Sequence, residues 1–144
     1  MNLFDDPAFG ASIPFVQHLG FVLTRFEGGH STITLAPRPE HLNSYGVAHG
    51  GVVMTLLDVG MVTALRSLAP GMGGVTIEMK TSFLRGATGA LRCEGTIKHR
   101  TNSLGFAEAT VYDSEGQACA HATGTFKLVK PRPAAAAGGV ISTD

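Results

Sequence analysis

Hydrophobic and polar residues alternate along much of this chain with a period of two, which is typical of strands with one buried face. The alternation is clearest over residues 75–83 and 91–98. The full set of predicted strands covers residues 21–27, 31–36, 75–83, 91–98, 106–112 and 118–129. Residues 113–116, Asp-Ser-Glu-Gly, are expected to form a tight turn between the last two strands. Strands joined by such local hairpins predict an antiparallel sheet.

Residues 52–68 depart from this alternation, because they are apolar on almost every face and too many for one strand. The pattern predicts a buried central helix that ends at Pro70-Gly71. One sheet covers only one side of such a helix, so a curled sheet or a second subunit must cover the rest. With a short helical turn near residues 15–19, the order of elements predicts an α+β fold around one central helix.

Composition narrows the class of protein. The 144 residues include 11 Lys and Arg against 11 Asp and Glu, so the formal net charge is zero, which argues against binding to nucleic acid or a membrane surface. No apolar run reaches the roughly 18 residues of a membrane span, and acids near the N-terminus replace the lysines of a signal peptide. We therefore expect a cytoplasmic protein with one domain over residues 1–130 and a flexible tail over residues 131–144.

Asp58 is the only charged residue between Val52 and Leu65, inside the predicted helix. A lone acid on a helix usually lies on a solvated face, but here no other residue on that face is charged. A carboxylate on an apolar helix is costly unless it is paired or used, and such surroundings raise its pKa. We therefore interpret Asp58 as a functional acid suited to act as a base or a nucleophile.

His49-Gly50-Gly51 stands directly before this helix. Free N–H groups at a helix start can hold an oxyanion, and glycine lets a substrate approach closely; alternatively, the two glycines only make the turn. Gly50 and Asp58 are about two helical turns apart, so one substrate could touch both, or Asp58 could serve a site built with a second subunit. Asn43, in the preceding loop, either forms an Asx turn or positions a water or a carbonyl.

The sequence lacks the motifs of several other kinds of functional site. The remaining histidines show no metal-ligand spacing, so neither a metal nor a cofactor is expected. A Gly-x-Ser-x-Gly elbow and the common phosphate-binding glycine loops are absent. The two cysteines, Cys93 and Cys119, are expected to be small buried apolar residues. Gly60, inside the predicted helix, indicates either close packing or access for a substrate.

The segment from Asn43 to Gly51, followed by Asp58, resembles the signature of hotdog-fold acyl-CoA thioesterases. The phenylacetate-pathway and 4-hydroxybenzoyl-CoA thioesterases are the most similar group. The likeness extends through residues 76–85 and 122–126, and covers roughly residues 20–129. It implies a hotdog fold, in which a curved antiparallel sheet wraps one long helix, and a homodimer that pairs into a homotetramer.

The resemblance also implies roles for individual residues. Asp58 would be the nucleophile or the general base, facing the loop of residues 43–51 in the other subunit. The Gly50 or Gly51 N–H would polarise the thioester carbonyl, His49 would orient that loop or the thioester, and Asn43 would position the attacking water or the carbonyl. The expected substrate-binding residues are Gly51, Met54, Met61, Phe83 and Arg85. Arg85 either holds the CoA phosphates or is an ordinary surface arginine.

Together these features predict an enzyme that hydrolyses an aryl- or medium-chain acyl-CoA thioester to the free acid and CoA. The alternative is a non-catalytic module that binds acyl-CoA. A dehydratase or hydratase is a third option, which an acid behind His-Gly-Gly does not suit. Loss of thioester cleavage in an Asp58→Asn variant would favour the thioesterase.

Overall fold

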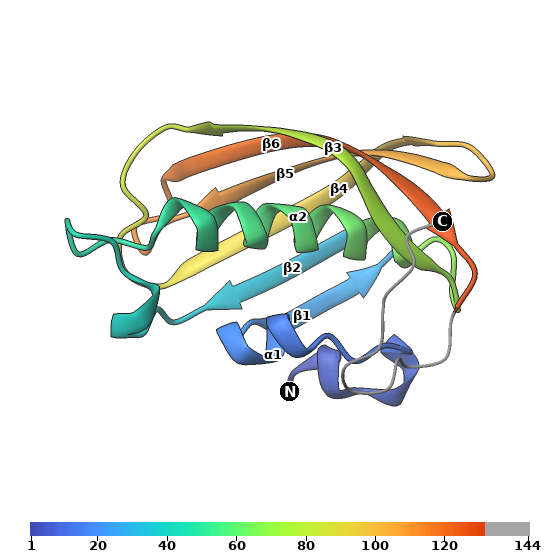
Figure 1. The fold of residues 1–144 in the computed structure, drawn as a ribbon, viewed down its shortest axis with the longest axis horizontal. Coiled ribbons are helices and arrows are strands. Elements are labelled where there is room, and N and C mark those ends of the chain that lie inside the picture. The colour runs from blue at the N-terminus through green and yellow to red at the C-terminus, as the bar shows by residue number, and fades with distance from the viewer. Residues whose placement is uncertain (132–144) are drawn as a thin grey trace, which may run out of the picture.

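The computed structural model describes residues 1–131 and consists of a curved sheet with one long helix lying across it (Figure 1). The strands are β1 (Val22–Glu27), β2 (His30–Leu35), β3 (Gly73–Phe83), β4 (Leu91–Arg100), β5 (Leu104–Tyr112) and β6 (Ala118–Val129). The helices are α1 (Pro14–Leu19) and α2 (Gly50–Arg66), with short 3₁₀ turns η1 (Leu3–Asp5), η2 (Pro7–Phe9) and η3 (Pro39–His41). The predicted tail lies, except for its first residue, outside the described residues.

The six strands form one sheet in the order β1-β2-β4-β5-β6-β3, and all neighbours are antiparallel. β1 and β3 are therefore the two edges. The chain reaches the β3 edge through α2, which crosses the face of the sheet (Figure 1). The predicted α+β hotdog architecture is confirmed, and all six predicted strands are present. The helix begins two residues earlier than predicted, at Gly50, and ends at Arg66.

The inner side of α2 lies very close to the sheet at Gly60. Ser31 Oγ donates a hydrogen bond of 2.6 Å to the Gly60 carbonyl. A Cβ on Gly60 would lie 2.8 Å from Cys93 Sγ, and a Cβ on Gly95 of β4 would lie 2.3 Å from the Gly60 oxygen. Close packing of helix on strand therefore explains the glycine inside α2. Cys93 and Cys119 are both buried, as predicted.

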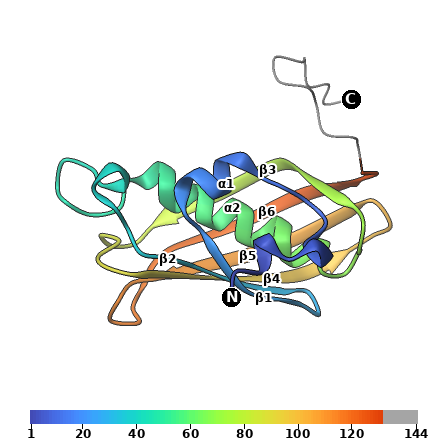
Figure 2. The same cartoon turned by 90° about the horizontal axis from the view of Figure 1, so that it is seen from below.

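The N-terminal segment covers one flank of α2, a role that the sequence pattern did not indicate. Phe4, Phe9, Val16 and Leu19 are all buried in the main core. These residues come from η1, η2 and α1, which lie along the β1 side of the helix (Figure 2). Their short turns show no extended periodicity, so the sequence predicted only the turn near residues 15–19. None of the helices in residues 1–131 is long and apolar enough to cross a membrane.

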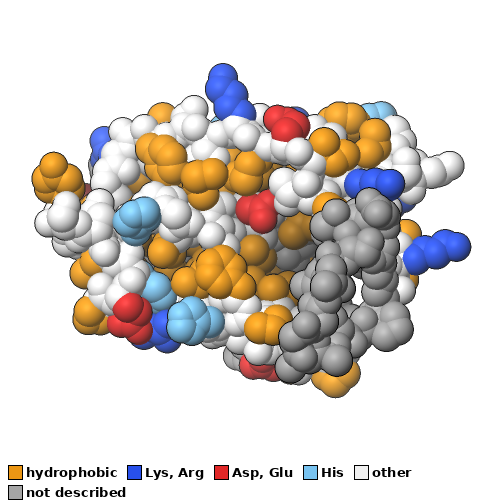
Figure 3. Space-filling view, in the orientation of Figure 1, with side chains coloured by type: hydrophobic (Ala, Val, Ile, Leu, Met, Phe, Trp, Pro, Cys, Tyr) orange, Lys and Arg blue, Asp and Glu red, His pale blue; other side chains and the backbone are white. Residues whose placement is uncertain are grey.

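No described residue gives such cover to the other flank of α2, beside β3. Met54 of α2 is 40% exposed, and Val75 and Ile77 of β3 are 41% and 55% exposed. Figure 3 shows hydrophobic side chains gathered along β3 and over this side of the helix. We use the name open flank for the exposed hydrophobic residues of α2 and of the β3 edge and its end, which are Met54, Val75, Ile77, Phe83 and Leu84. The sheet curls around α2 without enclosing it, so one subunit satisfies only part of the predicted need for cover.

Candidate active site

The start of α2 holds one backbone N–H that is free to bind an oxyanion. His49 is the N-cap: its carbonyl accepts from Val52 N (2.9 Å) and Val53 N (3.1 Å). Its Nδ1 accepts from Gly51 N at 2.9 Å. Among residues 1–131, no group accepts a hydrogen bond from Gly50 N. Of the two N–H groups considered from the sequence, Gly50 is therefore the one available for a ligand.

The cap also fixes the tautomer of His49. An Nδ1 that accepts a hydrogen bond carries no proton, so the neutral ring carries its proton on Nε2. The His49 residue is exposed, and this Nε2–H is left to donate outward. The backbone around it is held firmly, since His49 N donates to His41 O (2.8 Å) and Ala48 N to Ala87 O (3.1 Å).

Asn43 forms the Asx turn that was one of its two interpretations. Its Oδ1 accepts from Tyr45 N (2.9 Å) and Val47 N (3.3 Å). The amide nitrogen makes no hydrogen bond to the described residues and remains a donor. The two interpretations are thus compatible, because the side-chain oxygen shapes the loop while the nitrogen stays available.

Asp58 lies in the gap between α2 and β3. Its side chain accepts one hydrogen bond, from Thr76 Oγ1 at 2.6 Å, and no cation lies within 4.0 Å of it in residues 1–131. Burial raises the pKa of the Asp58 carboxyl, and the Thr76 hydrogen bond opposes this effect in part. The predicted functional acid is therefore half-buried, has no counter-ion among the described residues, and is more basic than an ordinary aspartate.

Thr76 is a site residue that the sequence analysis missed, and a β-bulge is the reason. Strict alternation places Thr76 on the same face as Glu78. The register between β3 and β6 shifts between these two residues, so Ile77 is an extra residue in the ladder. The bulge turns Thr76 toward α2. Gly74 faces the same way, because a Cβ on Gly74 would meet Val62 of the helix. Bulges are common next to active sites, where they re-aim a side chain.

A cavity of about 230 Å³ joins several of the predicted residues. It lies between the loop before α2, the first turn of α2 and the end of β3. Asn43, Gly50, Phe83 and Arg85 all line it. The Phe83 ring lies 3.4 Å from the position that a Cβ on Gly50 would occupy, so the missing side chain keeps this cavity open. The structure thus brings together four of the nine predicted residues.

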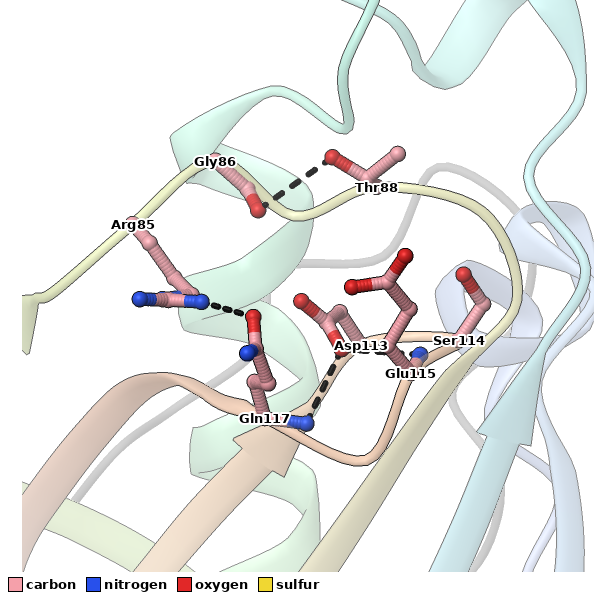
Figure 4. A pocket seen from close by; sticks show the side chains of 7 residues that line it. All are labelled: Arg85, Gly86, Thr88, Asp113, Ser114, Glu115 and Gln117. Atoms are coloured by element: carbon pink, nitrogen blue, oxygen red, sulfur yellow. Dashed lines mark hydrogen bonds between the residues drawn. The ribbon is translucent and has the colours of Figure 1, made fainter.

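A second cavity, of about 310 Å³, lies next to the first and shares Arg85 and Gly86 with it (Figure 4). Arg85 points toward Gln117 and donates to its side-chain oxygen. Asp113 and Glu115, from the β5–β6 hairpin, stand on the opposite wall. Arg85 therefore separates an apolar cavity beside Gly50 from a more polar one.

The remaining predicted residues lie elsewhere. Met54 is on the open flank, and Gly51 is occupied by the cap. Met61 is fully buried on the sheet side of α2, and its terminal methyl lies 3.2 Å from the Cβ position of Gly124. Asp58 is eight residues after Gly50, about 12 Å along the axis. Within one subunit, the acid and the free N–H do not meet.

The curved antiparallel sheet and the single long helix across it define a hotdog-fold protein. The thioesterase superfamily pattern matches residues 45–120, more than half of the chain. The protein therefore belongs to the thioesterase superfamily. It is a hydrolase of the esterase and thioesterase type.

Known relatives agree with this assignment. The chain is 28% identical over 113 residues to a protein of Saccharolobus solfataricus that is named, provisionally, an esterase; the match covers 78% of this chain and 75% of that protein. A conserved protein of Pseudomonas aeruginosa superposes with a TM-score of 0.77 at 27% identity, covering 82% of this chain and 95% of its own. The PaaI protein of the Escherichia coli phenylacetic acid degradation operon has the same fold, with a TM-score of 0.76 at 19% identity, over 82% of this chain and 86% of that one.

Proposed function

We propose that this protein hydrolyses an aryl- or medium-chain acyl-CoA thioester to the free acid and CoA. The observation that carries the proposal is Asp58, a half-buried carboxylate with a raised pKa and a single hydrogen bond, which faces an open apolar flank. A carboxylate in such a place is suited to attack a thioester or to activate water. No metal or cofactor takes part in the proposed reaction.

The proposed site combines Asp58 of one subunit with Gly50 of another. A donor 2.9 Å from a carbonyl oxygen and a carboxylate about 3 Å from the carbonyl carbon can be only about 7 Å apart. The rise along α2 separates Gly50 from Asp58 by about 12 Å, which is too far. A second copy laid on the open flank would hide Ile77 and Val75 and bring its own loop to Asp58. We propose a cytoplasmic homodimer that pairs further into a homotetramer.

Each residue then has a role in the reaction. The Gly50 N–H polarises the thioester carbonyl and holds the developing negative charge, an interaction typically worth about 3 kcal/mol. Asp58 attacks the carbonyl carbon or removes a proton from the attacking water. His49 Nε2–H and the Asn43 amide nitrogen orient the thioester or that water. Met54 and Phe83 contact the acyl group, Gly51 supports the oxyanion site through its cap, and Arg85 contacts the CoA phosphates.

Release of free CoA thiol from a panel of acyl-CoA esters tests the activity. The panel contains phenylacetyl-, hydroxybenzoyl-, short-chain and medium-chain thioesters. We expect turnover with an aryl or a medium-chain ester, and its loss in Asp58→Asn. Binding of the esters without any turnover would instead identify an acyl-CoA-binding module.

Mixed dimers test the sharing of the site. Gly50→Pro removes the N–H, and proline suits the first helical position, because His49 has an extended backbone (φ −59°, ψ 142°). Gly50→Ala retains the N–H and is the control for the added Cβ. Each homodimer, Gly50→Pro or Asp58→Asn, should be inactive. A heterodimer of the two has one intact shared site and should recover about half of the wild-type activity. An inactive heterodimer would contradict the shared site.

A further inference from the structure

Arg66, the last residue of α2, is a buried cation far from the site described above. It is only 8% exposed. Its Nε donates to Met72 O at 3.0 Å, and its Nη2 donates to Phe9 O at 2.7 Å. The guanidinium also lies over the Phe9 ring, 4.3 Å from its centroid. Arg66 thus ties the N-terminal segment and the α2–β3 connection to the end of the helix.

Within residues 1–131, these contacts leave the charge of Arg66 without a counter-ion. No carboxylate in residues 1–131 lies within 4.0 Å of the guanidinium. Burial lowers the pKa of Arg66, and no carboxylate opposes this effect. The side chain carries five N–H donors, and its Nη1 makes no hydrogen bond to the described residues. A buried charge is costly unless an opposite charge pairs with it.

Arg66 lines a cavity of about 490 Å³, which we call the Arg66 cavity. The N-terminal segment, the α2–β3 connection and the end of β6 form its walls, and none of the described residues that line it is acidic. Lys130 supplies a second cation, and Ser12 supplies a hydroxyl. Met72 and Val129 give it an apolar surface. Its volume is in the range of small-molecule sites.

We propose that the Arg66 cavity binds an organic carboxylate with an apolar body. A carboxylate matches the planar guanidinium, which can donate two parallel hydrogen bonds, and Lys130 adds a second positive charge. The apolar body would lie against Met72 and Val129. The cavity is distinct from the thioester site, because Arg66 is about 24 Å along the helix axis from Gly50 and about 12 Å from Asp58.

The ligand class follows from the chemistry of the walls and does not depend on the proposed activity. The acid released by acyl-CoA hydrolysis belongs to the same class, so the product is a natural occupant. Binding can be measured directly on the wild-type protein, without turnover. Failure of the catalytic proposal and failure of this one are therefore separate results.

Titration of the ¹⁵N-labelled full chain with sodium hexanoate and sodium benzoate, followed by NMR, tests the proposal. We expect saturable shifts of the Gly10, Gly71 and Gly73 amides, which line the Arg66 cavity. Hexanamide, which has the same apolar body and no charge, should produce none. Shifts confined to the surroundings of Asn43 and Gly50, or equal shifts with hexanamide, would overturn the proposal.

Variants separate ligand binding from the structural role of Arg66. Because Arg66 holds two backbone carbonyls, its removal can disturb the fold, so Lys130→Gln is the first variant. Removing this second cation should weaken hexanoate binding about fivefold. Arg100→Gln is the matched control, since Arg100 donates to Leu68 O (3.1 Å) and does not line the cavity. Equal affinity for hexanoate in Lys130→Gln and Arg100→Gln would contradict the proposal and assign Arg66 a structural role only.

Discussion

The hydrogen bond between Thr76 and Asp58 gives the sharpest test of how this site works. Thr76→Val keeps the shape of the side chain and removes the hydroxyl that donates to the carboxylate at 2.6 Å. Hydrogen bonds to charged groups are worth about 1.5–3 kcal/mol, and partial exposure places this one at the lower end. About 1.4 kcal/mol corresponds to a tenfold change in the ratio of charged to neutral Asp58.

The sign of the effect follows from the charge of the active form. The Thr76 hydroxyl stabilises the carboxylate and so opposes the rise in the pKa of Asp58 that burial causes. Its removal should raise that pKa further. In the proposed mechanism the carboxylate is the reacting form, so the acid limb of the kcat/KM profile should move to higher pH, and activity below the limb should fall about tenfold.

The assay is thiol release from the best acyl-CoA substrate between pH 4 and pH 8. Thr76→Ser keeps the hydroxyl and should retain the wild-type profile. Thr125→Val is the matched control, because Thr125 Oγ1 donates to the Glu78 carboxylate at 2.9 Å outside the site. An unchanged acid limb in a folded Thr76→Val protein would refute the assignment of Asp58 as the titrating catalytic group.

Four further predictions concern stability and assembly. Gly95→Ala should lower the free energy of unfolding, measured by urea denaturation, by about 3 kcal/mol, since its methyl would lie 2.3 Å from the Gly60 oxygen. Gly60→Ala should lower it by only about 1 kcal/mol, because the better helix propensity of alanine offsets part of the clash with Cys93. Ile77→Lys should shift the protein toward monomers in analytical ultracentrifugation and abolish turnover, whereas an unchanged mass would contradict the proposed interface. Asp58→Asn should be more stable than wild type at pH 7 and equal to it below pH 4, because the raised folded-state pKa makes stability fall as pH rises through it.

Much of the fold could be predicted because its elements differ in period. The strands alternate, the central helix does not, and the proline and glycine positions separate them. Asp58 could also be found from the sequence, because the cost of one acid on an apolar helix is evident without coordinates. The choice of Gly50 over Gly51 could not, since it depends on which N–H the His49 ring caps. The N-terminal cover escaped prediction because η1, η2 and α1 are too short to show a period.

The bulge at Ile77 shows why a site is harder to predict than a fold. The alternation of β3 is regular in sequence, and a regular strand would point Thr76 away from Asp58. One extra residue reverses this orientation, and only the pairing with β6 reveals it. A single-residue change of register leaves the sheet intact but decides which side chain touches the carboxylate.

The fold and the proposed chemistry both depend on the side of α2 that the described chain leaves uncovered. An apolar helix needs cover on all sides, and this chain supplies the sheet on one side and Phe4, Phe9 and Val16 on another. The side left uncovered is the one that carries Asp58. If the chain closed this flank itself, the carboxylate would be buried among apolar groups with no route for a substrate. In the proposed dimer, a second subunit on this flank would stabilise the assembly and would also complete a site in which the acid and the oxyanion donor come from different chains.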